Sequence, residues 1–115
     1  MLRTMLTGLW AGLFAGLLSL TPTLAAEDHK AEATRHALAA AESAKKGDAA
    51  AVGEHIIAAK AQAEAAEKEK ANPHLETAIK YLDRAIEHSK KGQIAIAGES
   101  AETAATHLKA AEKAF

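Results

Sequence analysis

From residue 27 onward, apolar residues recur at intervals of three and four, which is the period of an amphipathic helix and not of a strand. Four such runs follow one another, and each predicts a helix with one apolar stripe. The stripes are Ala33, Ala37, Ala40 and Ala44; Ala49, Val52, Ile56, Ala59, Ala63 and Ala66; Leu75, Ala78, Leu82, Ala85 and Ser89; and Ile94, Ala97, Ala101, Ala104, Leu108 and Ala111. Stripes of this kind are the seams along which helices pack in a bundle.

Glycine, proline and capping residues mark the ends of these helices. Gly47 and Gly92 each follow two lysines, which is typical of a helix that ends in a left-handed residue. Asp48 can cap the next helix, and Asn72 before Pro73 predicts an N-cap followed by the first helical residue. The predicted helices span residues 27–46, 48–70, 73–91 and 93–114.

The second half of this helical region repeats the first. A shift of 45 residues gives identical residues at 15 of 42 positions; six of these are alanine pairs, but the others include both KKG turns and both GE dipeptides. We interpret this as a duplicated helical hairpin. Because one hairpin cannot cover its own apolar stripe, the pattern predicts an all-α fold, an antiparallel up-down four-helix bundle over residues 27–115.

Alanine dominates the predicted seams. Alanine lets helices approach closely but buries little area, so we expect modest stability. Gly53 and Gly98 fall at equivalent positions inside helices, where a glycine costs about 1 kcal/mol relative to alanine. We therefore expect close contact between helices at both glycines.

Residues 1–26 have a different pattern. Arg3 precedes a short apolar stretch that ends in small residues, the layout of a secretory signal peptide with cleavage at Ala25 or Ala26. The stretch is shorter than the roughly 20 residues of a membrane helix. We expect export to the periplasm; the alternative is an uncleaved N-terminal anchor.

Composition narrows the function classes that remain. Arg3 is the only charged residue before Glu27, so 13 of the 14 basic residues stay with all 15 acidic ones, a net charge of about −2. Such a balance argues against nucleic acid and against a membrane surface as partners after cleavage. Cysteine is absent, which excludes disulfides and thiolate metal sites. Only Tyr81 and Phe115 are aromatic beyond the leader, so a large apolar ligand pocket is not expected.

All six histidines occupy one kind of position, directly before a seam position, which we call an edge position. Edge positions recur every seven residues and line one side of each helix. They are His29, His36 and Ser43; Asp48, His55, Gln62 and Glu69; His74, Tyr81 and His88; and Gln93, Ser100, His107 and Ala114. The alternative is that each histidine is only a half-exposed polar residue, but neutral imidazole is the commonest metal ligand in proteins.

Helix geometry limits how these histidines can share an ion. Edge positions seven apart are about 10.5 Å apart along the axis, so a second ligand must come from the next turn or from another helix. Glu32 lies one turn from both His29 and His36. Heights measured from the turns predict an end site from His29, Glu32 and His74, with His107 about a turn away, and a middle site from His36 and His55. His88 stands apart, near Glu87 and Asp83.

Imidazole with carboxylate suits divalent transition metals. Cu(II) is favoured because it usually binds such donors most tightly, and Ni(II) and Zn(II) are the alternatives. With two or three protein ligands per ion we expect exchangeable binding that weakens as the pH falls through about 6.5.

The helical region resembles the small metal-binding protein family, exported four-helix bundles rich in histidine. The likeness runs through EATRHA, GEH, NPHLETAIKYLDRAIEHSKKG and THLKAAEK. It implies periplasmic binding of several divalent metal ions, copper prominently, for buffering or sequestration. The ligand-type positions that it implies are His36, His55, His74, His88 and His107.

The chain departs from the family pattern by having fewer histidines than the resemblance implies. The substituted positions are Ser43, Asp48, Gln62, Thr77, Tyr81, Gln93 and Ser100. A lower metal capacity than in the family pattern follows.

The chain has no Glu-x-x-His pair for a di-iron bundle, no haem-attachment motif and no catalytic triad, so it is not expected to be an enzyme. The other interpretation is a helical interaction or scaffold protein of the cell envelope.

Overall fold

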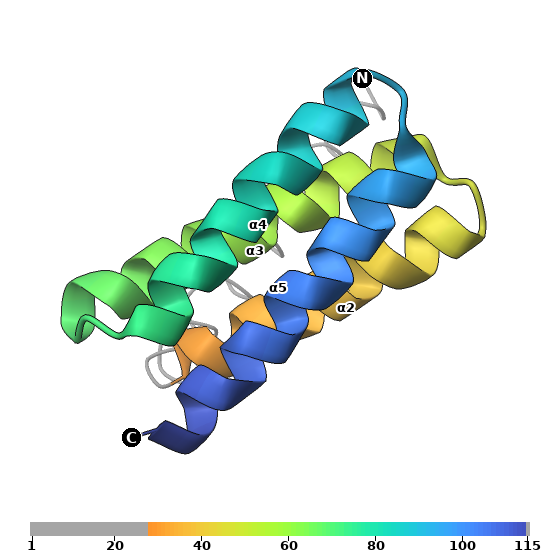
Figure 1. Ribbon diagram of the computed structural model, residues 1–115. Helices are drawn as coiled ribbons and strands as arrows, with labels where there is room; N and C mark the ends of the chain where they lie inside the picture. The colour runs from red at the N-terminus through yellow and green to blue at the C-terminus, as the bar shows by residue number, and fades with distance from the viewer. Residues whose placement is uncertain (1–27, 115) are drawn as a thin grey trace, which may run out of the picture.

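Four helices make up the fold. The computed structural model describes residues 28–114, and the predicted export signal, residues 1–26, lies outside them. The helices are α2 (His29–Lys45), α3 (Ala49–Glu69), α4 (Pro73–Lys90) and α5 (Ile94–Ala114). They form one elongated bundle (Figure 1), which confirms the predicted all-α four-helix fold. Between residues 28 and 114, no helix combines the length and apolar character needed to cross a membrane.

The predicted helix ends are correct to within one or two residues because their signals are local. The Asp48 side chain accepts a hydrogen bond from the Ala51 amide at 3.1 Å, and Asn72 accepts one from the His74 amide at 2.7 Å. These caps satisfy amides that have no partner inside the helix. Gly47 and Gly92 adopt φ angles of 74° and 79°, the left-handed conformation that their position after paired lysines predicts.

The helices stand in a four-membered ring, in chain order. α2 packs against α3 and α5, and α4 packs against the same two helices, so α2 and α4 lie diagonally across the core from each other. In Figure 1, α4 and α5 lie toward the viewer with α3 and α2 behind them. This order decides which histidines can meet.

The core is small and consists mostly of alanine. Of 19 buried hydrophobic side chains among the described residues, 14 are alanines. The five larger ones are Val52, Ile56, Leu75, Leu82 and Leu108. Nearly every predicted seam position is buried; the exceptions are the seam residues nearest the two glycine turns, namely Ala44, Ala49, Ser89 and Ile94. The turns leave these four positions without a facing helix on one side.

The two internal glycines differ in their surroundings. A Cβ at Gly98 would overlap the Cβ of Ala44, so α5 and α2 approach closely there. A Cβ at Gly53 would meet only the hydroxyl oxygen of Ser89, at an ordinary 3.7 Å. The expected close helix contact is therefore present at Gly98 and absent at Gly53.

Candidate metal centre

The edge positions of each hairpin face each other across the groove between its two helices. In the first hairpin, His29 meets Gln62, His36 meets His55, and the Ser43 carbonyl accepts from the Asp48 amide. Early residues of α2 thus pair with late residues of α3, because the Gly47 turn sets the register. We call this groove the α2/α3 edge, and the corresponding groove of the second hairpin the α4/α5 edge.

His36 and His55 form the closest pair of imidazoles. Their Nδ1 atoms are 3.5 Å apart and their ring centroids 5.7 Å apart. Two nitrogens that each bind one ion at about 2.0–2.1 Å in tetrahedral geometry are separated by about 3.4 Å. An ion can therefore bind both nitrogens after a slight rotation of the rings. The structure thus brings together the two histidines of the predicted middle site; that they bind metal stays a prediction.

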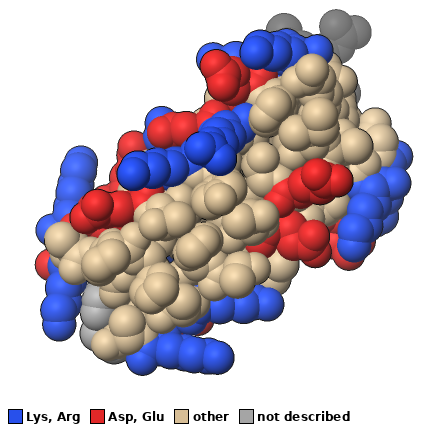
Figure 2. Space-filling view, viewed as in Figure 1, with Lys and Arg blue, Asp and Glu red and all other residues tan. Residues whose placement is uncertain are grey.

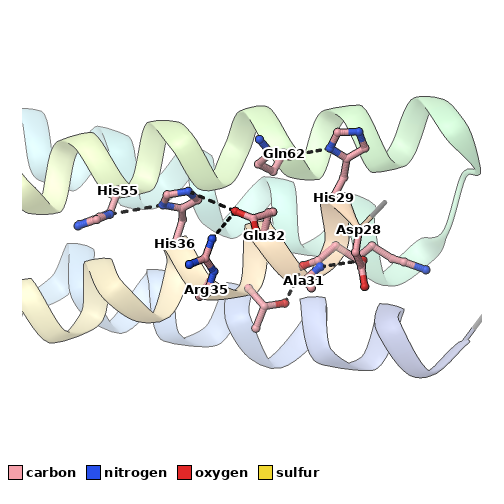
Figure 3. Close-up of polar contacts among 10 residues, drawn as sticks. Asp28, His29, Ala31, Glu32, Arg35, His36, His55 and Gln62 are labelled. Atoms are coloured by element: carbon pink, nitrogen blue, oxygen red, sulfur yellow. Dashed lines mark hydrogen bonds and ion pairs between the residues drawn. The ribbon is translucent and has the colours of Figure 1, made fainter. Parts of the chain in front are cut away.

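A carboxylate lies beside this pair. Glu32 Oε1 is 4.0 Å from His36 Nε2, and the Arg35 guanidinium binds the same oxygen (Figure 3). Glu32 is one turn before His36 on α2, as the sequence predicts. It supplies negative charge near the imidazoles, while Arg35 offsets part of it.

His29 is oriented by α3 and not by α4. Its Nδ1–H donates to Gln62 Oε1 at 2.6 Å, which leaves the lone pair of Nε2 available, and Nε2 is 3.4 Å from Glu69 Oε2. In many metal-binding histidines a hydrogen bond of this kind, from the ring nitrogen that does not bind the metal, fixes the tautomer. The spacing between Nε2 and Oε2 suits two ligands of one tetrahedral ion.

His74 and His107 form a second pair of imidazoles, on the α4/α5 edge. Their ring centroids are 6.1 Å apart with 29° between the ring planes. Tyr81 stacks on His107 at 5.8 Å, and the Arg84 guanidinium lies 5.1 Å from the centre of the Tyr81 ring. This pair thus sits beside an aromatic ring and a cation.

His88 lies near the Gly92 turn, as expected, but not with the acidic neighbours that the sequence suggested. Its Nδ1–H donates to Gln93 Oε1 at 2.7 Å. Asp83 instead accepts a hydrogen bond from Lys60 of α3 at 2.6 Å, which raises the pKa of that lysine.

The predicted end site is not assembled. Among residues 28–114, no three histidine or acidic side chains lie close enough to hold one ion. His29 contacts α3 whereas His74 contacts α5, since α2 and α4 are diagonal and their edge positions face opposite sides of the bundle. The end site of His29, Glu32, His74 and His107 is therefore wrong as a single cluster.

Sequence reasoning missed Glu69 and Gln62 as partners of His29. Both lie at edge positions, and the pairing of His36 with His55 across the Gly47 turn places position 29 opposite position 62. Counting outward from the turn within one hairpin would have found Gln62, and Glu69 is the next edge position on the same helix. The donors of the described chain thus come in pairs, each pair belonging to one hairpin.

Burial lowers the pKa of His36 below its usual 6.5, and the neighbouring His55 imidazole lowers it further. His36 therefore stays neutral near pH 7, with a lone pair available to a metal. Because the unfolded chain takes up this proton first, the resulting contribution to stability is complete above about pH 6.5 and is lost as the pH falls below it.

We expect an NMR titration to give His36 a pKa below 6.5. In a His55→Gln variant the pKa should rise part of the way back, because the charge effect of His55 is gone while the burial remains. A pKa of 6.5 or above, or one that His55→Gln leaves unchanged, would contradict this account of the pair.

The sequence matches one known protein family. A family model described as small metal-binding protein matches residues 3–111 of the chain. No curated protein matches the sequence. The matched segment includes every histidine and both edges.

Proposed function

The chain belongs to the small metal-binding protein family, and from this premise we propose that it binds divalent transition-metal ions at the paired donors of its helix edges. We further propose that it buffers or sequesters these ions in the periplasm, with Cu(II) the preferred ion and Ni(II) or Zn(II) the alternatives. The role is one of binding, without catalysis.

The pairing of His36 with His55 carries this proposal. Two imidazole nitrogens 3.5 Å apart on neighbouring helices are close to the spacing of two ligands of a tetrahedral ion such as Zn(II), and a rotation of the rings can bring them to the closer spacing of adjacent ligands of tetragonal Cu(II). Their side chains are half-buried, so an ion can reach them from solvent. His29 with Glu69 offers a second pair of donors on the same edge, at 3.4 Å.

The donor types favour the later divalent metals. Sites built from imidazole nitrogen and carboxylate oxygen generally bind Cu(II) more tightly than Ni(II) or Zn(II). Since each pair supplies two ligands, water completes the coordination sphere of a bound ion. Binding of this kind is exchangeable, which suits buffering better than a permanent structural role.

The proposed location rests on the N-terminal sequence. Residues 1–26 have the basic start, apolar stretch and small-residue end of an export signal, and the family match begins inside this segment, at residue 3. A periplasmic protein meets metal ions before they reach the cytoplasm. Buffering of copper or its neighbours is consistent with that position.

Calorimetric titration with Cu(II) and with Zn(II) tests the middle pair. We expect the double variant His36→Gln, His55→Gln to bind one ion fewer per chain than the unchanged protein, because both nitrogen donors of one site are gone. A matched control replaces Glu42 and Glu54 by glutamine, since these exposed carboxylates lie outside the histidine pairs. Unchanged stoichiometry in the histidine variant would contradict the proposal.

A scaffold role has less support. The large hydrophobic side chains that are exposed among the described residues are Ile57 and Ile96, which lie on different helices, α3 and α5. Single exposed apolar side chains are common and do not make a docking surface. The close pairs of imidazoles, by contrast, are what a metal-binding role requires.

A further inference from the structure

The two edges of the bundle offer a metal ion different surroundings. On the α2/α3 edge, carboxylates accompany the imidazoles: Glu32 lies 4.0 Å from His36, and Glu69 lies 3.4 Å from His29. On the α4/α5 edge, His74 and His107 meet each other, and the phenol ring of Tyr81 stacks on His107. The copies of the repeat therefore carry chemically different pairs.

Within α4 and α5, no acidic residue lies one helical turn from either ring of the second pair. The residues one helical turn from His74 within α4 and from His107 within α5 are all neutral. They are Thr77, Ala78, Thr103, Ala104, Ala110 and Ala111. The guanidinium of Arg84 lies over Tyr81, whose ring stacks on His107. α4 and α5 lie toward the viewer in Figure 1, and Figure 2 shows the same face in space-filling form. A broad part of this face carries no Lys, Arg, Asp or Glu, and charged residues lie along its borders.

A site without negative charge disfavours a dication relative to a monocation. A carboxylate beside the ligands offsets one of the two charges of a divalent ion, whereas two neutral imidazoles offset neither. A nearby guanidinium adds repulsion that grows with the charge of the bound ion. The α4/α5 edge therefore suits a singly charged metal ion better than the α2/α3 edge does.

The number and spacing of the donors point the same way. Cu(II) and Ni(II) prefer four ligands in tetragonal geometry, whereas Cu(I), with a filled d shell, is satisfied by two nitrogens in line. Two imidazoles that hold one ion in line at about 2 Å have ring centroids about 6 Å apart. The centroids of His74 and His107 are 6.1 Å apart, which matches this distance, and because the rings are stacked both must turn to aim a nitrogen at a shared ion.

We propose that His74 and His107 form a Cu(I) site, in which each imidazole gives one nitrogen to a two-coordinate ion between α4 and α5. The inference rests on the proposed metal-binding function and adds to it a division of labour. The α2/α3 edge takes divalent ions with carboxylate help, and the α4/α5 edge takes the reduced, singly charged form of copper. The Tyr81 ring lies nearly parallel to the His107 ring, with 5.8 Å between their centroids.

The test uses Cu(I), supplied anaerobically as its acetonitrile complex, in competition with the chromophoric chelator bicinchoninate. We expect the unchanged protein and the control His36→Gln, His55→Gln to retain one Cu(I) per chain. We expect His74→Gln, His107→Gln to bind Cu(I) at least about tenfold more weakly. Removing only a residue that hydrogen-bonds a metal ligand already lowers metal affinity by about 10- to 100-fold, and this variant removes both ligands themselves. Circular dichroism checks that each variant is folded.

NMR of the unchanged protein provides a second readout that needs no variant. Cu(I) is diamagnetic, so we expect the imidazole resonances of His74 and His107 to shift without broadening while those of His36 and His55 move little. Equal loss of Cu(I) in both double variants, or shifts confined to His36 and His55, would overturn the assignment. Histidine-dependent binding of Cu(II) with no binding of Cu(I) would overturn this inference alone, whereas binding of neither would overturn the proposed function as well.

Discussion

Replacing Ile56 by alanine is expected to lower the free energy of unfolding by about 2–5 kcal/mol, the cost of truncating a large side chain in a packed core. Ile56 is fully buried and is one of only five core side chains larger than alanine in the described part of the chain. The surrounding core is mostly alanine, whose short side chains cannot move to fill the space. Since small domains have total stabilities of about 5–15 kcal/mol, this one change removes a large share.

The next residue provides the control. Ile57 follows Ile56 on α3 but is 60% exposed, so Ile57→Ala deletes the same atoms from solvent-facing surface. We expect a change within about 0.5 kcal/mol, as for other surface substitutions. Urea denaturation followed by circular dichroism measures both. Similar losses in the two variants would show that the bundle does not depend on its few large side chains as described.

The fold was predictable from the sequence because its determinants are local or periodic. Asp48 and Asn72 cap helices through hydrogen bonds to amides two or three residues away, and Gly47 ends a helix through its own φ angle. None of these depends on distant parts of the chain. The seam positions repeat every three or four residues, and burying them together leaves little choice but a bundle.

The candidate site was predictable only within a hairpin. The Gly47 turn sets which residues of α2 and α3 are level, so the pairing of His36 with His55 follows from the distance of each from that turn. Placing His29 beside His74 needed the order of the helices around the core, which no local signal encodes. An equal number of residues from the turns does not bring His29 and His74 together, because their helices lie diagonally across the core.

The difference between the two edges also has a local origin. The position that carries His36 in the first copy carries Tyr81 in the second, and Glu32 corresponds to Thr77. These two substitutions remove an imidazole and a carboxylate from the second copy, and they leave His74 and His107 as its one close pair of imidazoles among the described residues. A repeated backbone thus presents two ligand sets of different charge.

Gly98→Ala is expected to destabilise the bundle by up to about 2 kcal/mol, although alanine is the better helix former. Within an exposed helix the same change would gain about 1 kcal/mol. At Gly98 the added Cβ overlaps the Cβ of Ala44, and both atoms are attached directly to helix backbones, so α5 and α2 must move apart. Overpacking of this kind costs about 1–3 kcal/mol, at least as much as the gain in helix propensity.

The equivalent glycine of the first hairpin tests this explanation with the opposite sign. A Cβ at Gly53 meets only the Ser89 hydroxyl at 3.7 Å, an ordinary contact, so Gly53→Ala should stabilise the protein by up to about 1 kcal/mol. The double variant Gly98→Ala, Ala44→Gly removes the overlapping Cβ from α2 and should recover the overpacking cost, less about 1 kcal/mol for the new helical glycine. The denaturation midpoints of the three variants measure these changes in stability. A Gly98→Ala variant that is more stable than the unchanged protein would mean that α2 and α5 are not held in contact at this point.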